Sequence, residues 1–146
     1  MNATVEHVDV AIVGGGMVGA SLALALTHTP LKVMLIEAVE SHSDVQPSFD
    51  DRATALGNGA RRVLHTLGVW PQIALKAAPI RGLHISDAGH FGFARLNASA
   101  HDLEAFGYSV SNRHIGAVLW GALRERGRIV LASPARVQAV DMHGAG

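Results

Sequence analysis

Three glycines near the N-terminus, spaced as G-x-G-x-x-G, are the residues of this sequence whose spacing points most clearly to a chemistry. Gly14 permits a sharp turn, Gly16 leaves no side chain between the backbone and a diphosphate, and Gly19 permits close packing of a helix. The first N–H groups of that helix would face an anion, which the positive end of the helix dipole also favours. Glu37 follows at a distance at which a carboxylate can accept hydrogen bonds from a ribose. This spacing predicts a dinucleotide-binding site.

The elements around the glycines must place them at the end of a strand. Residues 8–13 form an apolar run, residues 20–26 suit a helix of small side chains, and residues 31–36 form a second apolar run that ends in an acid. Such runs are typical of parallel strands that are buried on both faces. A membrane span is disfavoured, because the apolar stretch 11–26 is too short to cross a bilayer. A signal peptide is disfavoured, because Glu6 and Asp9 stand where a signal peptide would carry positive charge. The order predicts a Rossmann-like βαβ unit of the α/β class.

The composition argues against several other classes of function. Lys plus Arg and Asp plus Glu each number 12, so no strong field points to nucleic acid. Cysteine is absent, which excludes disulfides, thiol catalysis and cysteine-ligated metals, and which suits the cytoplasm. The nine histidines form no H-x-x-x-H pair, and we therefore predict no metal site.

Two further helices are expected from capping residues and apolar spacing. Asn58 would cap the first, which would end at Gly68. Ser111 or Asn112 would cap the second, which would end at Gly127. Both helices carry an apolar stripe at helical spacing, and so both are expected to pack against a core.

The remaining segments predict a loop and more strands. Polar residues break any hydrophobic period over 38–51, which predicts a long loop. Residues 80–96 have the alternation of a hairpin outside the nucleotide-binding unit, and residues 129–131 predict a third strand of the parallel sheet. Val137 and Val140 suggest a further edge strand.

The glycine turn and the strand after it resemble a known fingerprint. The spacing G-x-G-x-x-G-x-x-x-A-x-x-L, followed by Val33 and Glu37, is similar to the FAD-binding pattern of flavoprotein monooxygenases related to para-hydroxybenzoate hydroxylase. Pro30 departs from that pattern, which often has glycine there. The departure concerns the turn between the helix and the strand and leaves the phosphate turn unchanged.

Three later segments narrow the resemblance to the hydroxylases of ubiquinone biosynthesis: residues 48–56, 67–70 and, above all, 84–93. The resemblance covers essentially the whole chain but only the N-terminal part of the family's usual length. The family's Asp-Gly motif, expected soon after Gly146, and its later Gly-Asp motif are missing, and so a truncated protein is expected. Residues 1–71 and 109–146 would then belong to the FAD-binding domain, and residues 72–108 would begin an inserted β-rich substrate domain.

The resemblance also implies an activity for the complete enzyme. It would bind FAD, accept hydride from NAD(P)H and hydroxylate a polyprenyl phenol with molecular oxygen, while the protein orients the reactants and excludes water. This chain alone is expected to be inactive. A greasy substrate implies peripheral association with the inner membrane or with a ubiquinone-biosynthesis complex, and missing strands would favour self-association of the fragment. The alternatives are a stand-alone module that binds NAD or ADP without catalysis, and an unstable product of a frameshifted gene.

Two arginines complete the predicted site. The resemblance places Arg52 beside the flavin, although a loop ion pair with Asp50 or Asp51 is the alternative. It places Arg113 at the FAD phosphates, with a solvated arginine as the alternative. Gly116 stands where many relatives carry glutamine. The residues predicted to bind FAD are Gly14, Gly15, Gly16, Met17, Val18, Gly19, Glu37, Ala38, Arg52 and Arg113.

No catalytic residue is predicted. His84 and His90 lie in the segment that resembles the start of the substrate domain, and His90 has the chemistry to deprotonate a phenol. A structural or solvated histidine is the favoured interpretation. Phe91, Phe93 and Phe106 have the chemistry to contact a prenyl tail, but core packing is the favoured role.

Overall fold

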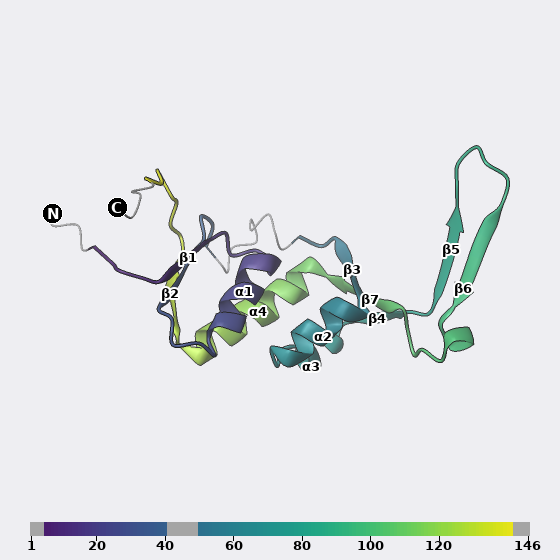
Figure 1. Ribbon diagram of the computed structural model, residues 1–146, viewed down its shortest axis with the longest axis horizontal. Coiled ribbons are helices and arrows are strands. Elements are labelled where there is room, and N and C mark those ends of the chain that lie inside the picture. The colour runs from purple at the N-terminus through teal and green to yellow at the C-terminus, as the bar shows by residue number, and fades with distance from the viewer. Residues whose placement is uncertain (1–4, 41–49, 142–146) are drawn as a thin grey trace, which may run out of the picture. The chain divides into compact units, whose positions relative to one another are not determined.

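The computed structural model describes residues 5–40 and 50–141. The chain divides into two compact units, residues 1–49 with 119–146 and residues 50–118, and Figure 1 labels most of their helices and strands. Helix α4 (Asn112–Arg126) contributes residues to both units. Each unit is described by itself below.

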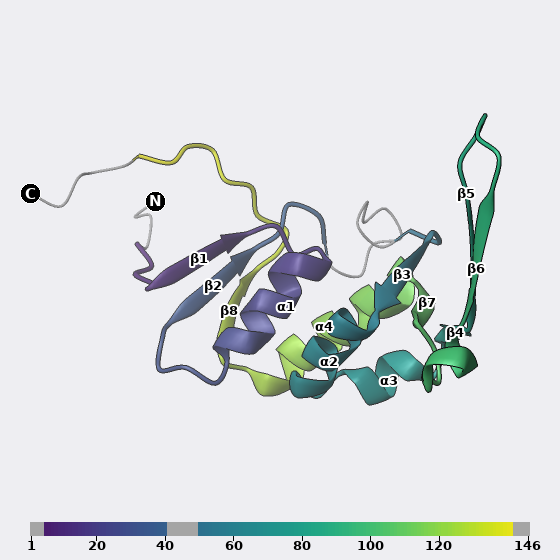
Figure 2. The ribbon, with the colours of Figure 1, turned by 45° about the vertical axis from the view of Figure 1, so that its right-hand side comes forward.

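The first unit contains a three-stranded parallel sheet in the order β1-β2-β8 (Figure 2). Its strands are β1 (Val10–Val13), β2 (Val33–Ile36) and β8 (Ile129–Ala132). Helix α1 (Met17–Leu26) joins β1 to β2 and lies against both. The predicted order of strand, glycine turn, helix and strand is confirmed, as is the third strand of the sheet.

Burial explains why these residues form this layer. The central strand β2 alternates in burial, and Val33 and Leu35 have no exposed area. On α1, Ala20 and Ala23 are also fully buried, and their small side chains let the helix approach the sheet closely. Leu24 fills the remaining space on the same face. The glycine turn is therefore held between a strand and a helix that are both anchored in a core.

The second unit contains an antiparallel sheet in the order β3-β7-β4, and a hairpin. The sheet strands are β3 (Ala53–Gly57), β4 (Ala78–Ile80) and β7 (Gly107–Ser111). The helices are α2 (Asn58–Thr66) and α3 (Trp70–Ala74), and the hairpin strands are β5 (Gly82–Ser86) and β6 (Phe93–Asn97), followed by the short 3₁₀ helix η1 (Ala98–His101). The hairpin was predicted. The three sheet strands were not, because they are short and rich in glycine, alanine and serine.

The helix ends agree with the sequence except at Asn58. Ser111 caps α4, because its Oγ accepts a hydrogen bond from the N–H of His114 at 3.3 Å. Gly68 and Gly127 follow their helices with φ of 75° and 62°. Asn58 is not the cap of α2, where Gly57 takes that position without a side-chain bond.

Asn58 instead contributes its side chain to a longer-range contact. Its Nδ2 donates to the carbonyl oxygen of Ala105 at 2.9 Å, and its Oδ1 accepts from Nε of Arg61 at 3.3 Å. An amide that has these partners is no longer available to cap its own helix. The prediction was therefore wrong because tertiary contacts competed with the local one.

The edge strand expected around Val137 and Val140 is absent from the described residues. The chain leaves β8 at Ser133 and Pro134, and proline has no N–H to donate to a ladder. The N–H of Ala135 then donates to the carbonyl oxygen of Glu37 at 2.7 Å, after which no strand pairing follows in the described part. Most of the predicted loop 38–51, residues 41–49, lies outside the described residues.

Candidate functional site

The glycine turn has the geometry that its spacing predicts. Gly14 has a φ of 101°, which L side chains rarely adopt, and its N–H donates to the carbonyl oxygen of Ile36 at 2.8 Å. A Cβ at Gly19 would lie 1.9 Å from the carbonyl oxygen of Gly14 and 3.3 Å from Cγ2 of Ile12. Gly14 therefore makes the turn, and Gly19 lets the helix press against it.

The N-terminus of α1 offers backbone donors to an anion. Gly16 is the N-cap, and no side chain caps the helix or places a negative charge in its first turn. The N–H of Ala20 bonds to the carbonyl oxygen of Gly16 at 2.9 Å. The N–H groups of Met17, Val18 and Gly19 precede it and have no acceptor among the residues that the structure describes. A row of free donors beside a turn without side chains fits a diphosphate.

Glu37 lies at the end of β2 and is tied to the turn. It is 7% exposed, its Oε2 accepts from the N–H of Gly15 at 2.6 Å, and its Oε1 accepts from the N–H of Val39 at 2.9 Å. Each carboxylate oxygen keeps a second lone pair, which a ribose hydroxyl can use. Ala38 is the exposed residue that follows. The first unit thus brings together eight of the ten residues predicted to bind FAD: Gly14, Gly15, Gly16, Met17, Val18, Gly19, Glu37 and Ala38.

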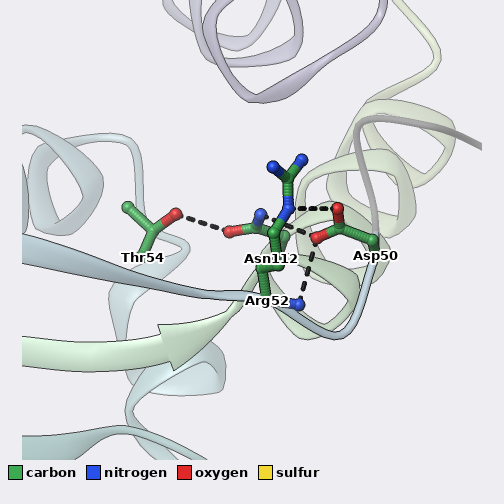
Figure 3. Close-up of polar contacts among 4 residues, drawn as sticks. All are labelled: Asp50, Arg52, Thr54 and Asn112. Carbon is green, nitrogen blue, oxygen red and sulfur yellow. Dashed lines mark hydrogen bonds and ion pairs between the residues drawn. The ribbon is translucent and has the colours of Figure 1, made fainter.

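The other two residues, Arg52 and Arg113, lie in the second unit. Arg52 pairs through Nε with Asp50, which is the ion pair that the sequence offered as its alternative role. Arg113 pairs through Nε with Oδ1 of Asp51 at 2.9 Å. The side chain of Arg52 is 80% exposed, and Figure 3 shows its terminal nitrogens pointing away from Asp50. An ion pair through Nε leaves those nitrogens able to bind a second anion.

A buried amide supports Asp50, and sequence reasoning missed it. Asn112 donates from Nδ2 to Oδ1 of Asp50 at 3.1 Å and accepts at Oδ1 from Oγ1 of Thr54 at 2.5 Å (Figure 3). The sequence marked Asn112 only as a possible helix cap. Its side chain joins the start of α4 both to β3 and to the segment before β3, which are links across 58 and 62 positions that no local pattern predicts.

This network changes the acidity of Asp50. Partial burial raises the pKa of Asp50, but hydrogen bonds from the side chain and backbone of Arg52 and from Asn112, together with the charge of Arg52, outweigh it. The net pKa of Asp50 is below its ordinary value. Because the folded-state pKa is lowered, the stabilising contribution of this carboxylate is present above the unfolded-state pKa and is lost as the pH falls through the folded-state pKa.

Replacing Arg52 should therefore raise the pKa of Asp50. In Arg52→Ala the side-chain hydrogen bond and the positive charge are both removed, while the N–H of residue 52 remains. We expect the carboxyl ¹³C titration midpoint of Asp50 to move upward relative to the wild type. Arg62→Ala, which removes an exposed arginine from α2, should leave the midpoint in place. An unchanged midpoint in Arg52→Ala would show that Arg52 does not hold this carboxylate in solution.

The two histidines of the hairpin region have ordinary partners. Nδ1 of His84 accepts from Nε of Arg95 at 3.2 Å, and the His84 ring stacks on Phe93 at 5.4 Å. His90 pairs with Asp87 at 3.0 Å, and both side chains are exposed. All of these contacts lie within the hairpin and its loop.

The aromatic residues of the hairpin do not pack in a core, contrary to expectation. Phe91 is fully exposed and Phe93 is largely exposed, and all residues of the hairpin strands β5 and β6 are exposed. Phe106 is partly buried and lies 6.1 Å from the ring of His101. Core packing therefore holds in part for Phe106 and is wrong for Phe91 and Phe93.

Neither a metal cluster nor a membrane span is present in the described part of the chain. No three side chains of His, Asp or Glu gather there in a way that could hold a metal ion. No helix there is long and apolar enough to cross a membrane. The glycine turn with Glu37 is thus the feature of the described residues with the clearest ligand chemistry.

The sequence of this chain is similar to those of known proteins. The chain is 31% identical over 138 residues to ubiquinone hydroxylase UbiL of Rhodospirillum rubrum, covering 93% of this chain and 32% of that protein. It is 34% identical over 144 residues to 3-demethoxyubiquinol 3-hydroxylase of Escherichia coli, covering 96% of this chain and 36% of that protein. The chain spans about a third of the length of these curated relatives.

The fold is also that of a solved structure. The crystal structure of p-nitrophenol 4-monooxygenase PnpA from Pseudomonas putida matches with a TM-score of 0.73 at 22% identity, covering 92% of this chain and 33% of that one. The model of the family described as FAD binding domain matches residues 7–146, which include the glycine turn and Glu37. This chain belongs to the FAD binding domain family, and its cofactor is FAD.

Proposed function

We propose that this chain holds FAD in a flavoprotein monooxygenase that hydroxylates a polyprenyl phenol in ubiquinone biosynthesis. The observation that carries the proposal is the glycine turn, where the N–H groups of Met17, Val18 and Gly19 are free within the described residues. The names of two relatives, a ubiquinone hydroxylase and a 3-demethoxyubiquinol 3-hydroxylase, support the substrate class. FAD, when bound, supplies the hydride and oxygen chemistry with NAD(P)H and molecular oxygen.

Most of the predicted residues have a proposed task toward FAD. The diphosphate would lie over residues 16–19, where the donors and the helix dipole act together. Glu37 would accept from the ribose with its remaining lone pairs, beside Ala38. The terminal nitrogens of Arg52 would donate to the cofactor while Asp50 holds Nε, and Arg113 would neutralise phosphate charge.

The domain division and the associations follow from the same proposal. Residues 1–71 and 109–146 would serve FAD, and residues 72–108 would begin the substrate domain. We propose that the exposed Phe91 and Phe93 contact the polyprenyl tail, and that the whole enzyme works peripherally at the inner membrane or in a ubiquinone-biosynthesis complex. Exposed Leu83 and Ile85 favour self-association of this chain.

A titration of the purified chain tests the cofactor assignment. We expect FAD to bind with a shift of its flavin absorbance, and ADP to compete with it, because ADP carries the diphosphate and ribose that the first unit would hold. Riboflavin, which lacks both, should not compete. Binding of NAD with no binding of FAD would contradict the proposal and would favour a nucleotide-binding module without flavin chemistry.

A further inference from the structure

Trp120 lies far from the glycine turn in the sequence and contacts it directly. It belongs to the part of α4 in the first unit and is 2% exposed. Its indole Nε1–H donates to the carbonyl oxygen of Gly15 at 2.9 Å, across 105 positions of the chain. Indole nitrogen is only a donor, and so this bond uses the whole polar capacity of the side chain.

Both backbone polar groups of Gly15, its N–H and its carbonyl oxygen, form hydrogen bonds with side chains. Its N–H donates to Oε2 of Glu37 at 2.6 Å, and its carbonyl oxygen accepts from Trp120. A Cβ at Gly15 would lie 2.4 Å from Cζ2 of Trp120 and 3.1 Å from Cβ of Glu37. The fingerprint leaves this position open, yet in this chain the two side chains leave no space for anything but glycine.

These two bonds fix two successive peptide planes. The N–H of Gly15 belongs to the plane shared with Gly14, and the carbonyl of Gly15 belongs to the plane shared with Gly16. The bond between Gly15 and Gly16 is not among the cis peptides of the described residues, so the N–H of Gly16 points opposite to the carbonyl that Trp120 holds. Trp120 therefore sets the direction of a donor at the N-cap of α1.

We propose that Trp120 is a positioning residue for the FAD diphosphate, an inference that rests on the proposed function of the glycine turn. A run of three glycines is costly to order, because glycine loses more conformational freedom than other residues. Side-chain bonds that order the run before binding remove that cost from the binding step. The guanidinium of Arg124 lies over the Trp120 ring, 5.6 Å from its centroid, and steadies the indole.

The test compares the two tryptophans of the chain. Trp120→Phe keeps a buried aromatic ring and removes the donor, whereas Trp70→Phe alters the other buried indole, which packs on Tyr108 at 5.0 Å in the second unit. We expect the Kd for ADP and for FAD to rise about tenfold in Trp120→Phe, the effect of losing roughly one buried hydrogen bond. In Trp70→Phe both Kd values should stay within about twofold. Equal urea midpoints in the two variants would separate positioning from general stability.

The outcomes distinguish this inference from the proposed function. If the wild type binds ADP and FAD and Trp120→Phe binds them equally well, the positioning role is wrong and the proposed function stands. If the wild type binds neither, the proposed function fails, and the inference fails with it. The wild type gives a second measurement that needs no variant: the indole ¹⁵N–H signal of Trp120 should be protected from exchange and should shift on addition of ADP. An indole signal that exchanges freely and does not shift would overturn the inference.

Discussion

Gly16→Val is expected to raise the Kd for FAD by about a hundredfold or more and to change the free energy of unfolding by only about 1 kcal/mol. Gly16 is the N-cap of α1 with φ −65° and ψ −175°, a backbone conformation that any L residue can adopt. The substitution therefore introduces no backbone strain. The valine side chain would instead occupy the space in front of the free N–H groups. A diphosphate would then lose both its close approach and its hydrogen bonds.

Gly57→Val is a matched control for this prediction. Gly57 is the N-cap of α2 with φ −68° and ψ 165°, and a Cβ there would meet nothing within 4 Å. It thus makes the same exchange at the same type of position, outside the glycine turn. We expect its Kd for FAD to stay within about twofold of the wild type. Flavin titration of both variants decides the matter, and equal affinities would show that the diphosphate does not lie over Gly16.

Gly19→Ala is expected to destabilise the protein by about 3 kcal/mol and to abolish FAD binding at micromolar concentrations. The added Cβ would lie 1.9 Å from the carbonyl oxygen of Gly14, and this obstacle is backbone that no rotamer change can move. The helix must therefore retreat from the turn. Since the turn and the first turn of α1 form the proposed diphosphate site, stability and binding should fall together.

Gly121→Ala is the matched control for Gly19→Ala, and it is expected to stabilise the protein where Gly19→Ala destabilises it. Gly121 lies within α4, and a Cβ there would meet nothing within 4 Å. We expect this variant to be more stable than the wild type by about 0.5–1 kcal/mol, because alanine favours the helix. Urea unfolding of both variants tests the contrast. A Gly19→Ala protein as stable as Gly121→Ala would mean that α1 does not press on the turn in solution.

Local sequence patterns were sufficient to predict the part of the first unit that is formed by consecutive residues. Residues 10–36 contain two apolar strands, a turn that needs a positive φ at Gly14, and a helix of small residues. Each of these is a property of neighbouring residues, and right-handed connection of parallel strands leaves few ways to assemble them. Fold class and nucleotide turn could therefore be predicted from the sequence.

The same local information failed in the second unit and near the C-terminal end of the first unit. The strands β3, β4 and β7 pair residues that are distant in the chain. Their own sequences have little of the apolar–polar alternation that would predict a strand. Asn58 has the residue type of a cap but bonds to Ala105 instead, and Val137 has the residue type of a strand but follows Pro134. In each case a tertiary contact or a missing donor decided against the local preference.

What the sequence by itself determined is thus the turn of glycines, its strand and helix, the acid at the end of β2, and membership of a class that binds a dinucleotide. Only the tertiary structure decided that Trp120 forms a hydrogen bond with Gly15 across 105 positions. It also decided that Asp50, the ion-pair partner of Arg52, accepts a hydrogen bond from Asn112. The physical reason is that backbone conformation and hydrophobic periodicity depend on neighbouring residues, whereas a hydrogen bond between distant side chains exists only after packing has brought them within reach.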